Sequence, residues 1–173
     1  MEKNVGLSVP VTWEKYPSDR HLDIFCSLSE YNPMLCGTFP IGIDVEGSDL
    51  DIIMEVHDFE RFETEMRRLY AGFEDFRIKR KKIRNEPVIK VNFTYEGFEY
   101  ELFGQAQPVE QQYAYLHMII ESKLMEEIPL LKEKVIYLKK QGVKTEPAFC
   151  KVLEIEGDPY DGLIEYGKQK GYI

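Results

Sequence analysis

The sequence has little cysteine, and the cysteines that it has form no recognisable ligand pattern. The 173 residues include Cys26, Cys36 and Cys150, with no Cys-x-x-Cys pair and no Cys/His spacing typical of zinc sites. Three widely spaced cysteines are typical of free thiols in a reducing compartment. We therefore expect no disulfide framework and a cytoplasmic location.

Long apolar segments and positive charge are also scarce. No stretch approaches the roughly 18 consecutive apolar residues of a membrane span, and the N-terminus lacks the apolar core of a signal peptide. The 22 Lys and Arg residues are outnumbered by 31 Asp and Glu, which gives a net charge of −9. An acidic chain attracts phosphate backbones weakly, so we expect neither a membrane nor a long nucleic acid as partner.

Several common catalytic motifs are absent as well. The sequence has no Gly-x-Ser-x-Gly, no Walker A loop and no dinucleotide-binding glycine pattern after a strand. Internal repeats and low-complexity tracts are absent too. The composition, 43% hydrophobic and 13% aromatic, predicts a folded globular chain with a buried core.

Hydrophobic periodicity predicts a helix, two strands, a helix, three strands and then helices only. The expected ranges are helix 18–31 with Ser18 as N-cap, strands 34–37 and 49–56, helix 58–70, strands from 74, over 88–95 and over 98–104, and helices 108–127, 130–141, 145–156 and 159–173. Glu96-Gly97 between two alternating runs predicts a hairpin. This order predicts an α+β fold with a mixed, mostly antiparallel sheet and flanking helices. We expect an α+β core over 1–107 and a C-terminal helical region over 108–173, packed together as a single compact unit.

The stretch 37-GTFPIGIDVEGSDLDIIMEV-56 places Asp49 and Asp51 at the start of an apolar strand. Side chains alternate along a strand, so the two aspartates share one face while the apolar residues around Asp51 point to the core. Two carboxylates this close repel each other unless a cation lies between them. Oxygen ligands suit Mg²⁺ or Mn²⁺, so the pattern indicates a metal site.

A metal site of this kind needs a third carboxylate, and the second hairpin strand offers two. Glu99 and Glu101 lie on the same face of the strand 98–104. Glu101 lies deeper, opposite Asn92, and is the better candidate, whereas Glu99 is near the turn and is the alternative.

Together these residues resemble the signature of the polymerase-β-like nucleotidyltransferase superfamily. Gly42 follows five residues after Gly37, and Asp49 twelve after it, which is the spacing of the minimal and the aminoglycoside nucleotidyltransferases. Within the superfamily, the chain most resembles an uncharacterised bacterial domain family with the pattern G-T-x-P-x-G-x-D-x-x-x-S-D-L-D and a later E-x-F-G-Q, here 101-ELFGQ-105. The resemblance implies a nucleotidyltransferase-like fold.

The resemblance also implies a role for each matched position. Asp49, Asp51 and Glu101 would be the catalytic residues and would hold Mg²⁺ or Mn²⁺. The triphosphate of the NTP substrate would be held by Gly37, Thr38, Gly42 and Ser48. Three positions depart from the superfamily pattern: Thr38 replaces the usual serine, Ile41 a basic residue and Glu101 an aspartate.

The implied activity is Mg²⁺-dependent transfer of a nucleoside monophosphate from an NTP to a hydroxyl group, with pyrophosphate leaving. The acceptor would be a small molecule or a protein. The alternative is a catalytically inactive nucleotide- or partner-binding module of the same fold. A homodimer is the default expectation for the oligomeric state.

Two further features have two interpretations each. Six of the eight residues from Arg77 to Arg84 are basic. They form either a cationic rim that steers an anionic substrate or a solvated edge strand in which lysine prevents aggregation. His117 is expected to be packed and hydrogen-bonded, with Glu121 one turn later as a helical partner, and the alternative is a role in lining the nucleotide pocket.

Overall fold

The computed structural model describes the backbone of residues 19–173 and the side chains of residues 23–173. The described chain forms two compact units that interleave in sequence. We call residues 19–37 with Gly47–Tyr115 the sheet unit, and Thr38–Glu46 with Leu116–Ile173 the helical unit. The predicted cap at Ser18 lies outside the described residues. The predicted boundary between an α+β core over 1–107 and a helical region over 108–173 stays a prediction. A compact unit is not by itself a domain that folds independently.

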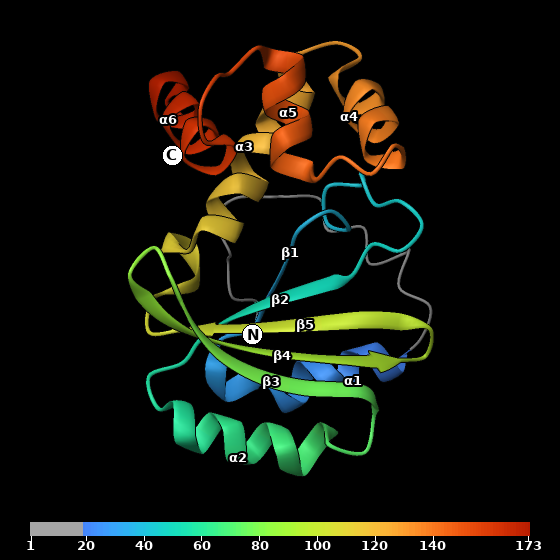
Figure 1. The fold of residues 1–173 in the computed structure, drawn as a ribbon, viewed down its shortest axis with the longest axis vertical. Helices are drawn as coiled ribbons and strands as arrows, with labels where there is room; N and C mark the ends of the chain where they lie inside the picture. Colours follow the sequence, from blue (N-terminus) through green and yellow to red (C-terminus); the bar gives the residue numbers. More distant parts are fainter. Residues whose placement is uncertain (1–18) are drawn as a thin grey trace, which may run out of the picture. The chain divides into compact units, whose positions relative to one another are not determined.

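The sheet unit is built on a five-stranded sheet in the order β1-β2-β5-β4-β3 (Figure 1). Only β2 and β5 pair in parallel, and the other three pairings are antiparallel. The mixed, mostly antiparallel α+β fold is therefore confirmed. The strands are β1 Met34–Cys36, β2 Leu50–Glu55, β3 Glu74–Ile83, β4 Glu86–Tyr95 and β5 Phe98–Gln105.

Glu96 and Gly97 form the predicted hairpin turn between β4 and β5. Both residues have positive φ, at 47° and 82°, as two-residue hairpins of the tight mirror-image type require. The turn fixes the register that places Asn92 opposite Glu101, as the sequence predicts.

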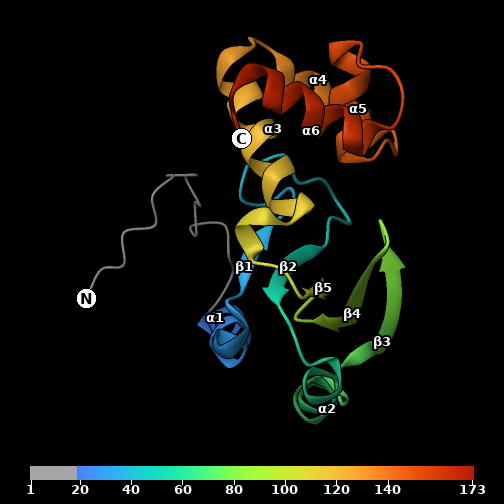
Figure 2. The same cartoon turned by 90° about the vertical axis from the view of Figure 1, so that its left-hand side faces the viewer.

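Two helices, α1 (Asp19–Ser27) and α2 (Phe59–Tyr70), pack on the same face of the sheet (Figure 2). Asp58 caps α2 as predicted, because its Oδ1 accepts hydrogen bonds from the backbone N–H groups of Glu60 and Arg61. A short 3-10 helix, Ser29–Tyr31, follows α1.

The core between the helices and the sheet is largely aromatic. Tyr70 of α2 stacks on Phe93 of β4 at 4.7 Å between ring centroids, and Phe93 stacks on Tyr100 of β5 at 5.1 Å. Phe62 and Met66, on the same stripe of α2 as Tyr70, are fully buried. Asp51 and Glu101 point to the opposite face of the sheet from this core.

The long helix predicted over 108–127 is interrupted. A 3-10 helix, Val109–Gln111, precedes α3 (Tyr113–Glu127), and Gln112 between them is extended, with ψ at 144°. The buried Gln112 amide donates to the carbonyl oxygens of Met54 and Gln107, at 3.0 and 2.9 Å. These two bonds tie the start of α3 to the end of β2 and explain the break.

The helical unit contains α3 from Leu116 onwards, α4 (Leu131–Lys140), α5 (Thr145–Leu153) and α6 (Pro159–Lys170). The predicted fifth helix ends at Leu153, three residues early, because Glu154 adopts the left-handed conformation. Gly142 ends α4 with a φ of 87°, as predicted. The core is apolar and includes Leu131, Val135, Phe149 and Leu163.

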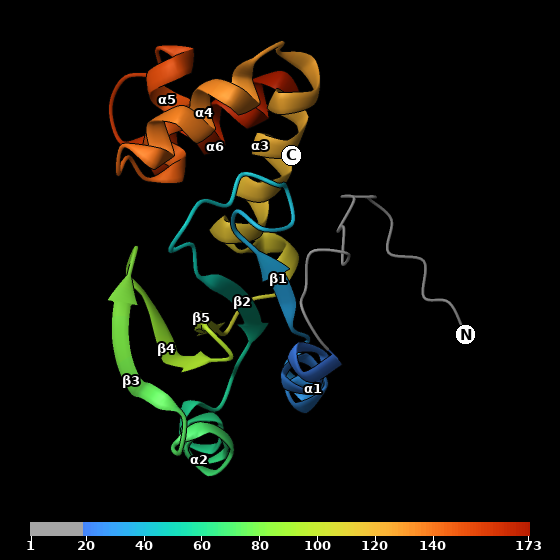
Figure 3. The ribbon, with the colours of Figure 1, turned by 90° about the vertical axis from the view of Figure 1, so that its right-hand side faces the viewer.

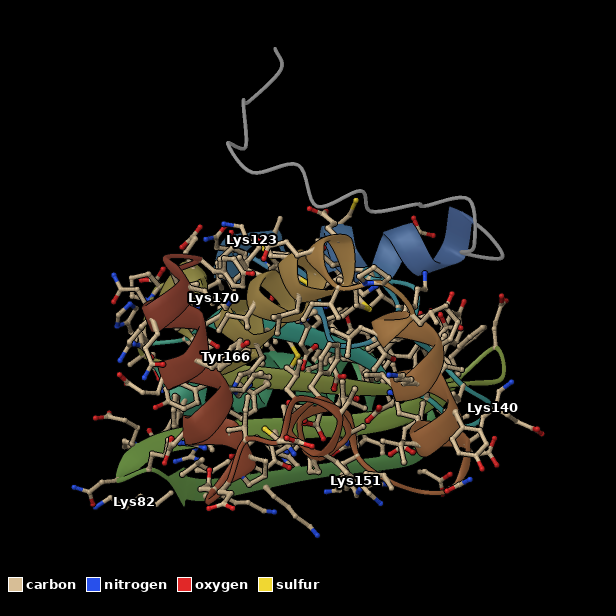
Figure 4. All side chains as sticks on the ribbon, turned by 90° about the horizontal axis from the view of Figure 1, so that it is seen from above. Lys82, Lys123, Lys140, Lys151, Tyr166 and Lys170 are labelled. Carbon is tan, nitrogen blue, oxygen red and sulfur yellow. The ribbon has the colours of Figure 1, made fainter. Side chains whose placement is uncertain are left out.

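The outer side of α6 is polar. Lys170 lies 5.7 Å from the centre of the Tyr166 ring on that helix (Figure 4).

Between residues 19 and 173, none of the helices is long and apolar enough to cross a bilayer.

Candidate functional site

Asp51 and Glu101 are register neighbours on the parallel strands β2 and β5. Neighbouring strands lie about 4.8 Å apart, and paired residues point to the same face. Asn92 on β4 and Arg77 on β3 continue the same row across the sheet. We call this face, opposite α1 and α2, the acid-bearing face. A single line across it thus carries two carboxylates, an amide and a guanidinium.

Asp49 lies one residue before β2 and is half-buried. Burial raises the pKa of its carboxyl group, and the charges of Glu101 and Glu99 raise that pKa further, while Lys90 lowers it. Asp49 therefore lies within the electrostatic field of the same acids that the sequence groups with it. That field favours a cation.

Lys90 is the residue that the sequence analysis missed. Its Nζ lies 2.7 Å from Glu101 Oε2, and Asn92 Nδ2 lies 3.4 Å from the same oxygen. The alternation of β4 places Lys90 on the same face as Asn92, so its face was predictable. Its pairing with Glu101 depends on the β4–β5 register.

The three predicted metal ligands do not form a ready-made site. Within residues 23–173, no three His, Cys, Asp or Glu side chains are arranged to hold a metal ion. Glu101 is turned to Lys90, so a cation between Asp51 and Glu101 requires Lys90 to release that carboxylate. The donor set itself, three carboxylates, fits a hard divalent cation.

The alternative third acid, Glu99, has another partner. It is exposed, and its Oε1 lies 2.6 Å from an Nη of Arg77. Glu99 therefore neutralises the charge of Arg77 on β3. Glu101 is the glutamate in register with Asp51.

The turn after β1 packs directly on Asp51. Gly37 has a φ of 74°, and a Cβ atom built there would collide with Asp51 Oδ2. Cys36, the register partner of Asp51 on β1, is buried, and both burial and the Asp51 charge raise the pKa of its thiol. Ser48, half-buried, directly precedes Asp49. Only glycine fits at position 37 without moving the aspartate.

The second predicted glycine lies in the helical unit. Gly42 donates its N–H to the Phe39 carbonyl, and Ile43 donates to the Thr38 carbonyl, both at 3.1 Å. A Cβ at Gly42 would lie 3.0 Å from Lys132 Nζ of α4. The sequence lacks a basic residue at position 41, and this structure instead places a lysine beside Gly42. The sequence could not show this, because the two residues are far apart in the chain.

His117 is buried, and its Nε2 lies 2.9 Å from the Tyr160 carbonyl oxygen. The expectation of a packed, hydrogen-bonded histidine is confirmed. Its acidic neighbour is Glu146 of α5, whose Oε1 lies 3.6 Å from His117 Nδ1. Glu121 is itself fully buried with no hydrogen bond to Oε1 in the described part of the chain, and burial raises its pKa well above the usual value.

The family model described as "Domain of unknown function (DUF4269)" matches residues 20–166. The chain belongs to this family. No curated protein matches the sequence.

Solved structures share the fold. A Cid1 poly(U) polymerase bound to MgATP is similar over 84% of this chain and 49% of that one, with a TM-score of 0.52 and 17% identity. A cytoplasmic RNA terminal U-transferase matches over 70% and 41%, with a TM-score of 0.47 and 20% identity. The polymerase core of TRAMP, an RNA surveillance complex, matches over 85% and 49%, with a TM-score of 0.47 and 12% identity.

The chain thus spans less than half of the length of these proteins. At such identities the similarity concerns the fold alone. The expected nucleotidyltransferase-like fold is confirmed, and the roles of individual site residues stay predictions.

Proposed function

We propose that this member of the DUF4269 family is a metal-dependent nucleotidyltransferase that moves a nucleoside monophosphate from an NTP to a hydroxyl group of a small molecule or protein. The observation that carries the proposal is the register pairing of Asp51 with Glu101, with Gly37 packed against the Asp51 carboxylate. The Cid1 polymerase, which shares the fold, was solved with MgATP, and this supports the choice of an NTP.

Asp49, Asp51 and Glu101 are the residues that would hold Mg²⁺ or Mn²⁺. Their fit rests on donor chemistry and charge, because burial and the Glu101 charge raise the pKa of Asp49, and a cation relieves such an excess of negative charge. The bound cation would neutralise triphosphate charge during in-line displacement at the α-phosphorus.

Besides holding the cation, the chain's own residues would have two tasks in this reaction. Gly37 and Ser48 are proposed to hold phosphate oxygens through backbone N–H and hydroxyl groups. For Thr38 and Gly42 the same role stays a prediction from the sequence.

The second task concerns the acceptor. Its hydroxyl oxygen forms a bond to the α-phosphorus, the bond from that phosphorus to the bridging oxygen breaks, and pyrophosphate leaves. The hydroxyl proton passes to a carboxylate, and Glu101 is the candidate base once Lys90 has released it.

Calorimetric titration of each NTP with Mg²⁺ tests the proposal, on the wild type and on Asp49→Asn/Asp51→Asn. One NTP should bind in the presence of Mg²⁺ only, and the double variant should lose that binding. Glu99→Gln, which changes an exposed acid of the neighbouring strand, is the matched control and should bind normally. The absence of binding for every NTP at millimolar concentration would contradict a transferase.

A non-catalytic binding module is the second candidate. The Lys90–Glu101 ion pair favours it, because a lysine already neutralises the carboxylate that a catalyst needs. Such a module predicts NTP binding without a metal, or no NTP binding at all. In either case Asp49→Asn/Asp51→Asn would leave the titrations unchanged.

A further inference from the structure

The edge strand β3 carries most of the basic cluster, and register assigns a face to each of its residues (Figure 3). From Arg77 onwards, odd-numbered positions face the acid-bearing side and even-numbered positions face the side of α2. The pairs that fix this assignment are Arg77–Asn92, Ile78–Val91, Lys79–Lys90, Arg80–Ile89, Lys81–Val88 and Lys82–Pro87.

Three cations of this hairpin have an acidic partner. Arg77 is paired with Glu99, and Lys90 with Glu101. On the other face, an Nη of Arg80 lies 3.0 Å from a Glu63 carboxylate oxygen of α2. Each of these charges is therefore neutralised within the chain.

Lys79 and Lys81 differ from these residues. Among residues 23–173, no carboxylate lies within ion-pair distance of either side chain. They follow one another at a spacing of two residues, about 7 Å along the strand. Both belong to the acid-bearing face.

Lys79 also lies directly opposite Lys90 in the β3–β4 ladder. Like charges in directly opposed positions destabilise an antiparallel pair. Lysines on an edge strand often prevent aggregation. That purpose does not require two lysines to lie on the same face of the sheet. Glu101 already neutralises Lys90, so a bound anion would have to neutralise only Lys79 of this pair.

The acid-bearing face thus changes sign across the sheet. Carboxylates lie on β2 and β5, and uncompensated ammonium groups lie on β3, two strand spacings or about 10 Å beyond β5. A molecule that crosses this distance could place a hydroxyl near the carboxylates and a phosphate on the lysines.

We propose that Lys79 and Lys81 bind a phosphate group of the acceptor, so that the acceptor is a phosphate-bearing molecule. The identity of the ligand as acceptor rests on the proposed function. The binding of phosphate by these two lysines does not, and it is tested without catalysis.

Two probes separate the sources of the phosphate: a fluorescent single-stranded oligonucleotide of a few residues, and ribose 5-phosphate as competitor. The proteins are wild type, Lys79→Gln/Lys81→Gln and Lys82→Gln. Lys82 is the matched control, because it is exposed on the same strand but faces the other side and projects outwards at the end of β3 (Figure 4).

We expect fluorescence anisotropy at low salt to show binding to wild type and to Lys82→Gln with similar affinity. The double variant should bind about tenfold more weakly, and the slope of log K against log salt should fall by about 1.4, for two phosphate contacts at about 0.7 each. If ribose 5-phosphate displaces the oligonucleotide, a phosphate monoester is sufficient for binding to the two lysines. If it does not, the ligand is a phosphodiester chain. Both outcomes support the proposal.

The proposal is overturned if neither probe binds, or if Lys82→Gln weakens binding as much as the double variant does. The lysines of β3 would then be edge protection. Asp49→Asn/Asp51→Asn removes negative charge from the same face and should bind the oligonucleotide at least as well as wild type. This experiment therefore tests phosphate binding by the two lysines even if the protein does not bind NTP.

Discussion

Lys90 of β4 holds the carboxylate of Glu101, with 2.7 Å between Nζ and Oε2. Both side chains are mostly buried, at 23% and 22% exposed, so solvent screens the pair only in part. Lys90 thus supplies a positive charge next to Glu101. In the proposed function, a divalent ion would compete with Lys90 for the Glu101 carboxylate.

Lys90→Gln should therefore bind Mg²⁺ more tightly than wild type does. Removing one nearby positive charge should raise the affinity about fivefold, which corresponds to about 1 kcal/mol. Calorimetric Mg²⁺ titration measures this, with Lys82→Gln on the opposite face of the sheet as control. An affinity that stays equal or falls would mean that Glu101 is not a metal ligand.

Gly37→Ala should damage both stability and nucleotide binding. The left-handed backbone at this position costs a residue with a side chain about 1–2 kcal/mol, and the new Cβ also pushes against Asp51. Urea unfolding and NTP titration measure the two effects.

Gly97→Ala is the control for the backbone term. Gly97 has a similar φ, at 82°, but nothing lies within 4 Å of a Cβ built there. It should lose a similar backbone contribution to stability and retain NTP binding. Equal NTP binding by the two variants would show that the Gly37–Asp51 contact has no functional role.

Mg²⁺ binding should weaken as the pH falls, and it should do so at a higher pH than for an ordinary aspartate site. The pKa of Asp49 is raised above 3.8 by burial and by the neighbouring acids, and a protonated Asp49 cannot bind the ion. The raised pKa also means that Asp49 lowers the stability of the metal-free protein as the pH rises from 3.8 through that pKa. Titrations across this range should show the shift, and Asp49→Asn should remove the Asp49 contribution to it.

Glu121→Gln should stabilise the protein at neutral and alkaline pH. Burial raises the pKa of Glu121 first, Glu146 raises it further, and Lys139 lowers it. The folded chain thus holds a proton that the unfolded chain loses near pH 4.5, so stability falls as the pH rises above this value. The amide has no proton to lose, so Glu121→Gln should lack this pH-dependent loss of stability.

Urea unfolding at pH 5 and pH 8 measures this effect. Wild type should lose more stability between the two conditions than Glu121→Gln does. Glu126→Gln, which changes an exposed glutamate of the same helix, should behave like wild type. A parallel pH dependence in all three proteins would contradict the assignment.

Alternation along the strands predicts much of the candidate site. It places Asp51 and Glu101 away from the core and Asn92 opposite Glu101, and the structure has them so. The parallel pairing of β2 with β5 was not predictable, because packing rather than local sequence selects it. The break at Gln112 was missed for a similar reason, since the amide is satisfied by the distant carbonyl of Met54.

The partners of the charged residues were also out of reach. Lys90 was visible in the sequence, but its choice of Glu101 depends on a register fixed by the Glu96-Gly97 turn. Lys132 lies ninety residues beyond Gly42 in the chain, and only the packing of the helical unit brings them together. Strand faces follow from composition and period, whereas charge pairing follows from three-dimensional packing.

The parallel pairing of β2 with β5 has a consequence for the order of folding. Leu50 pairs with Tyr100, fifty residues further along the chain, whereas β3, β4 and β5 are joined by short turns. Pairings between distant segments carry the larger entropic cost of loop closure and form late. We therefore expect Asp51 to reach Glu101 after β3, β4 and β5 have paired, when Lys90 already lies beside Glu101.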